Sequence, residues 1–317
     1  MGKYILNRLL WMIFVLVGTA IVIFTIMYFI PKDIAKVLLG SSATQAELAS
    51  LRERLGLNDP YIVQLLRYLK NVFTKFDLGK SYIYNVPVMQ ELLSRIPRTF
   101  FIGCSVILFD SLLGIPLGLM AGLNQNKWQD ALCMVLALIF VSVPNFWLAL
   151  QLVDIFAVKL HWLPAFGIGG IKYYIMPVFA AFVSGVATNA RQMRSSLLDV
   201  TRADYITSAR AKGVSERNVV LKHMLPNALI PVVTGLGVGL GKSIAGSVII
   251  ETVFTIPGVG MYLLTGINNA DYPVVQGSII ILSFFSALVM LLLDIVYAQV
   301  DPRIKAQYSG RMHGVTK

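Results

Sequence analysis

The chain has 317 residues, of which 56% are hydrophobic and only 14% are charged, and its formal net charge is +11. With a mean hydropathy of +0.72, this composition excludes a soluble globular domain and predicts an all-α integral membrane protein. The positive charge alone would allow a nucleic acid partner, but its distribution along the chain excludes one.

Six apolar stretches are long enough to cross a bilayer as helices, which takes about 20 residues. Between the fourth and fifth stretches, the segment 191–227 holds seven Lys and Arg residues, whereas 251–271 holds none. Short cytoplasmic loops carry an excess of such residues, so the segment 191–227 and both chain ends are expected in the cytoplasm. The predicted spans are Leu9–Ile30, Thr99–Ala121, Ala131–Val153, Tyr173–Ala190, Ala228–Ile250 and Tyr272–Leu293.

Between the first two spans, residues 31–98 are predicted to form a small helical subdomain outside the membrane. Thr44 and Glu47 have the spacing of a capping box, and a helix with leucines at helical spacing is expected to run to Gly56. Asp59 and Pro60 predict the start of another helix, and both helices are expected on the outer membrane surface. The apolar face expected for the second helix consists of Ile62, Leu65, Leu66, Leu69 and Val72.

The second and third spans contain ionisable and helix-breaking residues. An ionised carboxylate in hydrocarbon is costly, so Asp110 should face a partner helix or a watery cavity, or be protonated, while Asp154 is expected at the interface. Pro144 should bend the third span. Cys104 and Cys133 are expected to be small buried apolar residues, with neither a disulfide nor a metal site.

A polar, basic segment at residues 204–227 separates the fourth and fifth spans, and is called the knob below. Asp204 is expected to cap a first helix, and Gly213 stands where a helix end favours a left-handed residue. Ser215 should cap a second short helix that Pro226 ends. Glu216, Arg217 and Lys222 are expected on the surface of the knob, which is suited to being held by another protein.

The spacing of Ala209, Gly213, His223, Leu225 and Pro226 resembles the coupling loop of the membrane subunits of ATP-binding-cassette (ABC) importers, in the dipeptide, oligopeptide and nickel branch. In that family the loop docks into a groove on a separate ATPase subunit. Thr207 and Ser208 replace the Glu and Ala of the general motif, so no carboxylate is implied at 207. The docking residues implied are Thr207, Ser208, Ala209, Arg210, Ala211, Lys212, Gly213, Ser215, Glu216, Arg217, His223, Leu225 and Pro226.

Further segments resemble the same family over nearly the whole length. LGLNDP with the later Asp77–Gly79 is similar to its external scoop, and Ser142–Trp147 resembles its SxPxFW pattern around Pro144 and Asn145. Glu251–Gly260 and Asp271–Gly277 match the external loop between its last spans. Pro257, Gly258 and Gly260 do not favour a helix, so this loop is expected to dip toward the outer mouth of the pathway. Asp294, Tyr297, Asp301, Pro302 and Arg303 match its terminal pattern.

The fifth span combines glycines at 235, 237, 239 and 241 with Lys242. A phosphate-binding loop is excluded because Leu236 stands where such a loop needs glycine, and glycines four apart favour close helix packing in a membrane. Lys242 departs from the family's neutral residue. It either packs or snorkels, or meets an acidic group of the cargo or Asp110. The pathway and gate candidates are Asp110, Pro144, Asn145, Lys242, Glu251, Pro257, Gly258, Gly260 and Asp271.

The resemblance implies a type I ABC importer permease fold with six transmembrane helices, in the cell membrane of a prokaryote. It implies a non-enzymatic subunit with a second permease, more often a distinct chain than a copy, and with two ATPase subunits that bind ATP and Mg. An external substrate-binding protein is the remaining partner, and no cofactor is expected in this chain. The expected divisions are a tail and first helix at 1–30, the external segment 31–98, the core 99–297 and a cytoplasmic tail 298–317.

Peptides are the expected cargo, with nickel or metal chelates and oligosaccharides as alternatives. A secondary transporter would be expected to show repeated halves, which the sequence lacks. An intramembrane protease using Asp110 and Asp294 would lack its accompanying GxGD motif, and Ser184 with His161 lacks a serine protease pattern.

Overall fold

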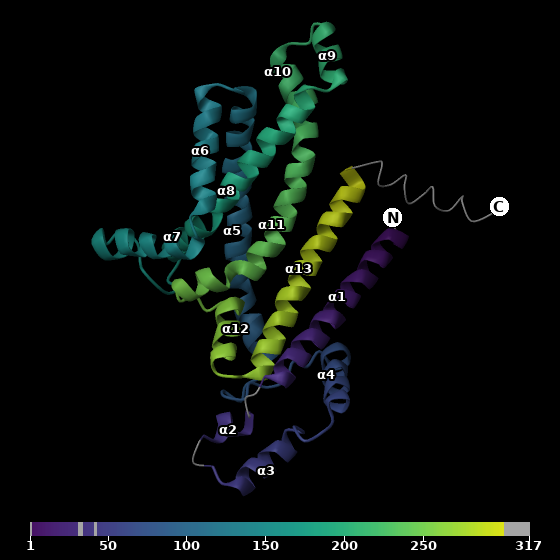
Figure 1. The fold of residues 1–317 in the computed structure, drawn as a ribbon, viewed down its shortest axis with the longest axis vertical. Coiled ribbons are helices and arrows are strands. Elements are labelled where there is room, and N and C mark those ends of the chain that lie inside the picture. Colours follow the sequence, from purple (N-terminus) through teal and green to yellow (C-terminus); the bar gives the residue numbers. More distant parts are fainter. Residues whose placement is uncertain (1, 31–33, 41–42, 301–317) are drawn as a thin grey trace, which may run out of the picture. The chain divides into compact units, whose positions relative to one another are not determined.

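The computed structural model describes residues 2–30, 34–40 and 43–300, and all of its regular elements in these ranges are helical (Figure 1). The described residues form two compact units, one made of those up to Arg98 together with those from Pro257 to Val300, and the other of Thr99–Ile256. Asp301, Pro302 and Arg303 of the predicted terminal pattern lie outside the described residues.

In the first unit, long apolar helices pack side by side and carry the short helices of the external segment (Figure 1). Ile23 and Met27 of α1 pack with Tyr272 and Val275 of α13, and the ring of Phe24 stacks on Tyr68 of α4 with centroids 5.1 Å apart. The elements wholly in this unit are α1 (Gly2–Phe29), α2 (Ile34–Leu39), α3 (Gln45–Arg54), α4 (Tyr61–Lys75), α12 (Val259–Asn268) and α13 (Tyr272–Val300).

The capping box predicted for the external segment is confirmed. The Thr44 hydroxyl accepts from the Glu47 N–H, and the Glu47 carboxylate accepts from the Thr44 N–H at 2.8 Å. Leu48 and Leu51 of α3 are buried. Of the apolar face predicted for α4, Leu65 and Val72 are buried and Ile62 and Leu66 are exposed, and its position on the membrane surface stays a prediction.

The second unit is built on α8 and α11, against which the other long helices pack (Figure 1). Gly114, Gly118 and Gly122 of α5 form a small-residue stripe against α8. A Cβ added at Gly118 would lie 2.4 Å from the carbonyl oxygen of Ala190, so this approach requires glycine. The elements are α5 (Val88–Leu123, which begins in the first unit), α6 (Trp128–Ser142), α7 (Asn145–Leu152), η1 (Val153–Lys159), α8 (Lys172–Thr201), α9 (Asp204–Ala211), α10 (Glu216–Asn218), η2 (Val219–Met224) and α11 (Leu225–Val253).

The third predicted span is not one helix. It breaks at Val143–Pro144, and the helices on either side of the break meet at 91°. Pro144 has extended backbone torsions and lacks the N–H that would continue α6, so the predicted bend is a right-angled break. Five helices of the described chain are long and apolar enough to cross a membrane, and the bent pair can serve as a sixth span.

Two smaller expectations also need correction. Cys133 is buried as expected, but Cys104 is exposed on α5, and both thiols are free. The fourth predicted span ended at Ala190, whereas α8 continues to Thr201, so the first part of the 191–227 segment is helix rather than loop.

Candidate functional site

The knob is a helix–turn–helix extension at the ends of α8 and α11. Its first helix, α9, ends at Lys212, and Gly213 follows with a φ of +77°. The Gly213 N–H donates to the Arg210 carbonyl at 2.9 Å, and the Val214 N–H donates to the Ala209 carbonyl at 3.3 Å. This is a Schellman turn, and its left-handed position favours glycine, as the sequence predicted.

An apolar core fixes the knob to the long helices. Ile206 and Ala209 of α9 pack with Val219 and Met224 of η2 and with buried residues of α8 and α11. The residues of α8 and α11 in this cluster are Met193, Leu197, Ala228 and Val232. The knob and the adjoining ends of α8 and α11 therefore share one packed core.

The outer surface of the knob is polar and charged. Arg210 donates to Glu216 with Nη2–Oε1 at 2.6 Å, which ties α9 to α10, and this bond raises the pKa of the guanidinium. Glu216, Arg217 and Lys222 are exposed as predicted, and Ala209 is buried. Of the other docking candidates, Thr207, Ser208, Ala211, Lys212, Gly213, Ser215 and Pro226 are exposed and His223 and Leu225 are half-buried.

The predicted helix boundaries of the knob are wrong in two places. Ala203 rather than Asp204 occupies the N-cap position of α9, and Asp204 is the first helical residue. Pro226 does not end a helix but lies in the first turn of α11, which continues directly from the π-helical turn Val219–Met224. Ser215 does occupy the N-cap position of α10, although its side chain makes no capping bond there.

Three of the pathway candidates line one cavity inside the second unit. This cavity has a volume of about 560 Å³ and lies among α5, α7, α8 and α11. Asp110 comes from α5, Asn145 from the start of α7 and Lys242 from α11. Pro144 is not a lining residue, but the break that it makes places Asn145 at the cavity wall.

The glycines of the fifth span pack closely, as predicted for Gly235 and Gly239. A Cβ at Gly235 would lie 2.5 Å from Oε1 of Gln192, and one at Gly239 would lie 3.2 Å from Cδ1 of Ile107. Both glycines also line the cavity. The absence of side chains on this face of α11 leaves room for the cavity next to Lys242.

Glu251 lies in helix rather than in the predicted external loop. Because α11 continues to Val253, its carboxylate is fully buried and accepts from Thr99 at 2.7 Å and from Ser247 at 2.8 Å. Gly260 is likewise helical and buried, in α12, so the loop around Pro257 and Gly258 is shorter than expected. At Gly260, tertiary packing stabilises a helix although glycine has a low intrinsic helix propensity.

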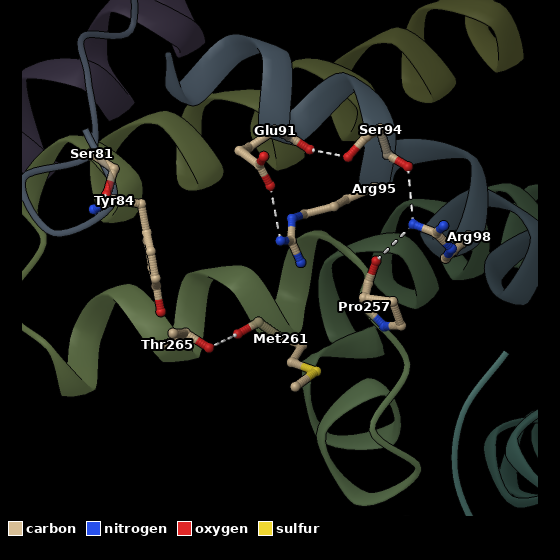
Figure 2. Close-up of polar contacts among 9 residues, drawn as sticks. All are labelled: Ser81, Tyr84, Glu91, Ser94, Arg95, Arg98, Pro257, Met261 and Thr265. Atoms are coloured by element: carbon tan, nitrogen blue, oxygen red, sulfur yellow. Dashed lines mark hydrogen bonds and ion pairs between the residues drawn. The ribbon is translucent and has the colours of Figure 1, made fainter. Parts of the chain in front are cut away.

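In the first unit, polar side chains at the start of α5 contact the loop that precedes α12 (Figure 2). Arg98 donates to the Pro257 carbonyl at 3.3 Å, and Glu91 pairs with Arg95 at 2.9 Å. The Arg95 guanidinium lies 4.5 Å from the centre of the Tyr262 ring. Neither Arg95 nor Arg98 was predicted as a site residue from the sequence, although the spacing of Glu91 and Arg95 is that of an ion pair along a helix.

Asp271 is a buried carboxylate of the same unit. It is 2% exposed and accepts from the Ser81 hydroxyl and from the Tyr82 N–H at 3.1 Å. Asp271 therefore ties the external segment to the start of α13. This role of Asp271 is structural. A role of Asp271 in the pathway stays a prediction.

Comparison with known families gives two matches. Residues 114–306 match the family described as the binding-protein-dependent transport system inner membrane component, and residues 1–103 match its N-terminal region. Among solved structures, the inward-facing MetNI methionine ABC transporter has a chain with a TM-score of 0.56 at 19% identity, covering 67% of this chain and 97% of that one. This likeness shows a type I ABC importer permease fold.

Curated relatives match over nearly the full length. The dipeptide transport system permease protein DppB of Alkalihalophilus pseudofirmus is 40% identical, with 96% of this chain and all of the relative covered. The glutathione transport system permease protein GsiC of Salmonella paratyphi A is 38% identical, with 96% of this chain and 99% of the relative covered. The chain therefore belongs to the family of inner membrane permease components of binding-protein-dependent ABC transport systems.

Proposed function

We propose that this chain forms half of the translocation pathway of an ATP-driven importer, and that the knob is where a separate ATPase subunit docks. The carrying observation is the geometry of the knob: a charged, exposed surface on a rigid turn whose core is continuous with α8 and α11. A loop that only determined topology would not need this core.

The mechanism follows from the same two helices. Both α8 and α11 carry the knob at one end and line the cavity further along. Motion of a bound ATPase during its ATP cycle would move the knob and shift both cavity walls. The pathway would then alternate between arrangements of nearly equal energy that the nucleotide state of the partner biases.

The proposed assembly contains a second permease, two ATPase subunits and an external substrate-binding protein. Each ATPase needs a docking knob, so one chain with one knob is half of the membrane part. ATP and Mg would be bound by the ATPases, and this chain would need no cofactor. The knob and both chain ends would lie in the cytoplasm.

Di- and oligopeptides are the proposed cargo, since permeases for a dipeptide and for the peptide glutathione resemble the chain over its full length. Nickel or metal chelates and oligosaccharides are the alternatives. The protease alternative is not favoured, because Asp294, the partner that it would need for Asp110, pairs with Arg8 at 2.8 Å.

Co-purification from the native membrane tests the docking proposal. The wild-type chain should retain the ATPase subunits, and the double variant Arg210→Ala with Gly213→Ala should lose them. The matched control is Arg67→Ala with Gly56→Ala, because Arg67 also pairs with a carboxylate and Gly56 also has a positive φ, in the external segment. Retention of the ATPases by the knob variant, or their loss from the control, would refute the proposal.

A further inference from the structure

The cavity of the second unit carries one anionic and one cationic side chain on different helices. Asp110 lies on α5 and Lys242 on α11, and both line the space of about 560 Å³. Cavities of roughly 300–1,000 Å³ hold small organic ligands. Two side chains of opposite charge in one such space require a physical explanation.

The carboxylate of Asp110 is buried without a full set of partners. Asp110 is 5% exposed, and its Oδ1 has no hydrogen-bond partner among the described residues. Gly185 of α8 makes room for it, because a Cβ there would lie 2.1 Å from Oδ2. A buried carboxylate is costly unless it is paired, so this site favours a cation that reaches it from the cavity.

Lys242 is exposed to the cavity, and in the part of the chain that the structure describes it forms no ion pair with Asp110. A lysine in a span is stable when its ammonium group reaches water or an anion. Apolar residues and neutral hydrogen-bonding side chains share the rest of the lining, the latter including Asn145, Ser184, Thr188, Asn189, Gln192 and Ser243. Amides and hydroxyls suit peptide groups, which both donate and accept hydrogen bonds.

We propose that this cavity is a transit site for zwitterionic cargo, in which Asp110 binds the free ammonium group of a short peptide and Lys242 binds its terminal carboxylate. The inference rests on the proposed importer function and specifies its substrate class: small molecules with both charges at their ends. The ammonium group of such a cargo would be the counter-charge for Asp110, and its carboxylate would be the counter-charge for Lys242.

Equilibrium dialysis of the complete importer in lipid nanodiscs tests the assignment, with three radiolabelled probes: dialanine, N-acetyl-dialanine and dialanine amide. Wild type should bind dialanine at least about tenfold more tightly than either blocked peptide, as expected for a charge-assisted hydrogen bond. Asp110→Asn should lose only the discrimination against the acetylated peptide. Lys242→Gln should lose only the discrimination against the amide.

Matched controls are Asp154→Asn and Lys159→Gln, which remove the same charges from an exposed pair that does not line the cavity. Both should keep wild-type discrimination. The inference is overturned if wild type does not discriminate, or if both cavity variants still do. It is also overturned if the two cavity variants have the same effect and their combination adds nothing, because the side chains would then pair with each other.

Uptake by proteoliposomes separates the two proposals. Charge-dependent binding at Asp110 and Lys242 without ATP-dependent uptake would contradict the importer function alone. ATP-dependent dialanine uptake with unchanged discrimination in both variants would contradict the transit site alone.

Discussion

Gly118 lies where α5 packs against α8 with no space for a side chain between the two helices. Gly118→Ala should destabilise the protein by about 1–3 kcal/mol, because a Cβ 2.4 Å from the Ala190 carbonyl oxygen forces the helices apart. Thermal unfolding in detergent measures the effect. Gly18→Ala is the control, since a Cβ there meets nothing within 4 Å; equal losses from both variants would contradict the packing argument.

Glu47 makes the external helix α3 sensitive to acid. Its hydrogen bonds from the backbone and side chain of Thr44 lower the pKa of the carboxyl below 4.5, the value for the unfolded chain. The Glu47 carboxylate therefore stabilises α3 fully when the pH is above the unfolded-state pKa. This stabilisation is lost as the pH falls through the lower pKa of the folded state.

Hydrogen exchange in α3 between pH 6 and pH 3 measures this effect. Wild type should lose protection in α3 as the carboxyl is protonated, while Glu47→Gln should start with less protection and change less with pH. The same acid-induced loss in Glu47→Gln would show that another group is responsible.

Several single residues could be predicted from the sequence because their signal is local. The capping box at Thr44 and the left-handed Gly213 depend only on neighbouring backbone, and both were predicted correctly. The burial of Glu251 could not be predicted, because it depends on which distant helices pack against it.

At the scale of elements, α6 and α8 are joined by an ion pair near the start of α6. Arg194 donates to both carboxylate oxygens of Asp130, with Nη2–Oδ2 at 2.7 Å, and Asp130 is 4% exposed. From the sequence, Arg194 was expected only as one of the basic residues that determine membrane topology. Its bidentate geometry makes it a structural residue as well.

Arg194→Ala should destabilise the protein by about 1–3 kcal/mol, because it leaves the Asp130 carboxylate buried without its main partner. Chemical unfolding in detergent measures the loss. Arg191→Ala is the control, since Arg191 is exposed on the same helix and should change stability by less than about 0.5 kcal/mol. If Arg194→Ala left the stability unchanged, the ion pair would not contribute to the packing of α6 against α8.

Span positions were predictable, whereas breaks and joins between helices were not. Proline in SVPNFW indicated a bend, but its size of 91° depends on how α7 packs against α8 and α11. Pro226 was predicted to end a helix, but the neighbouring sequence alone does not distinguish a proline that ends one helix from a proline in the first turn of the next. Only the π-helical turn that precedes it, Val219–Met224, shows that the chain continues into α11.

For the whole molecule, the proposed importer function requires the knob and the external segment to lie on opposite sides of the membrane. Ser215 of the knob and Ser50 of α3 are both exposed, so Ser→Cys substitutions at these positions form a matched pair. In a background with Cys104 and Cys133 replaced by alanine, a membrane-impermeant maleimide added to intact cells should label the residue at 50 and not that at 215. Labelling at 215 in intact cells would reverse the topology.

Family membership and fold class were evident from motifs spread along the sequence, and the comparisons bear them out. The cavity was not predictable, because periodicity does not show which polar residues of separate spans share one space. Asp110, Asn145 and Lys242 were each singled out on their own chemistry, and only the folded second unit brings them together.

ATP-dependent uptake of labelled dialanine by proteoliposomes tests the central claim most directly. The complete complex, with its binding protein, should take up peptide only when ATP is present on the side of the knob. Arg210→Ala with Gly213→Ala should abolish uptake, while Gly18→Ala, where an added Cβ meets nothing within 4 Å, should preserve it. Uptake at the wild-type rate without ATPase subunits, or with the altered knob, would contradict the account.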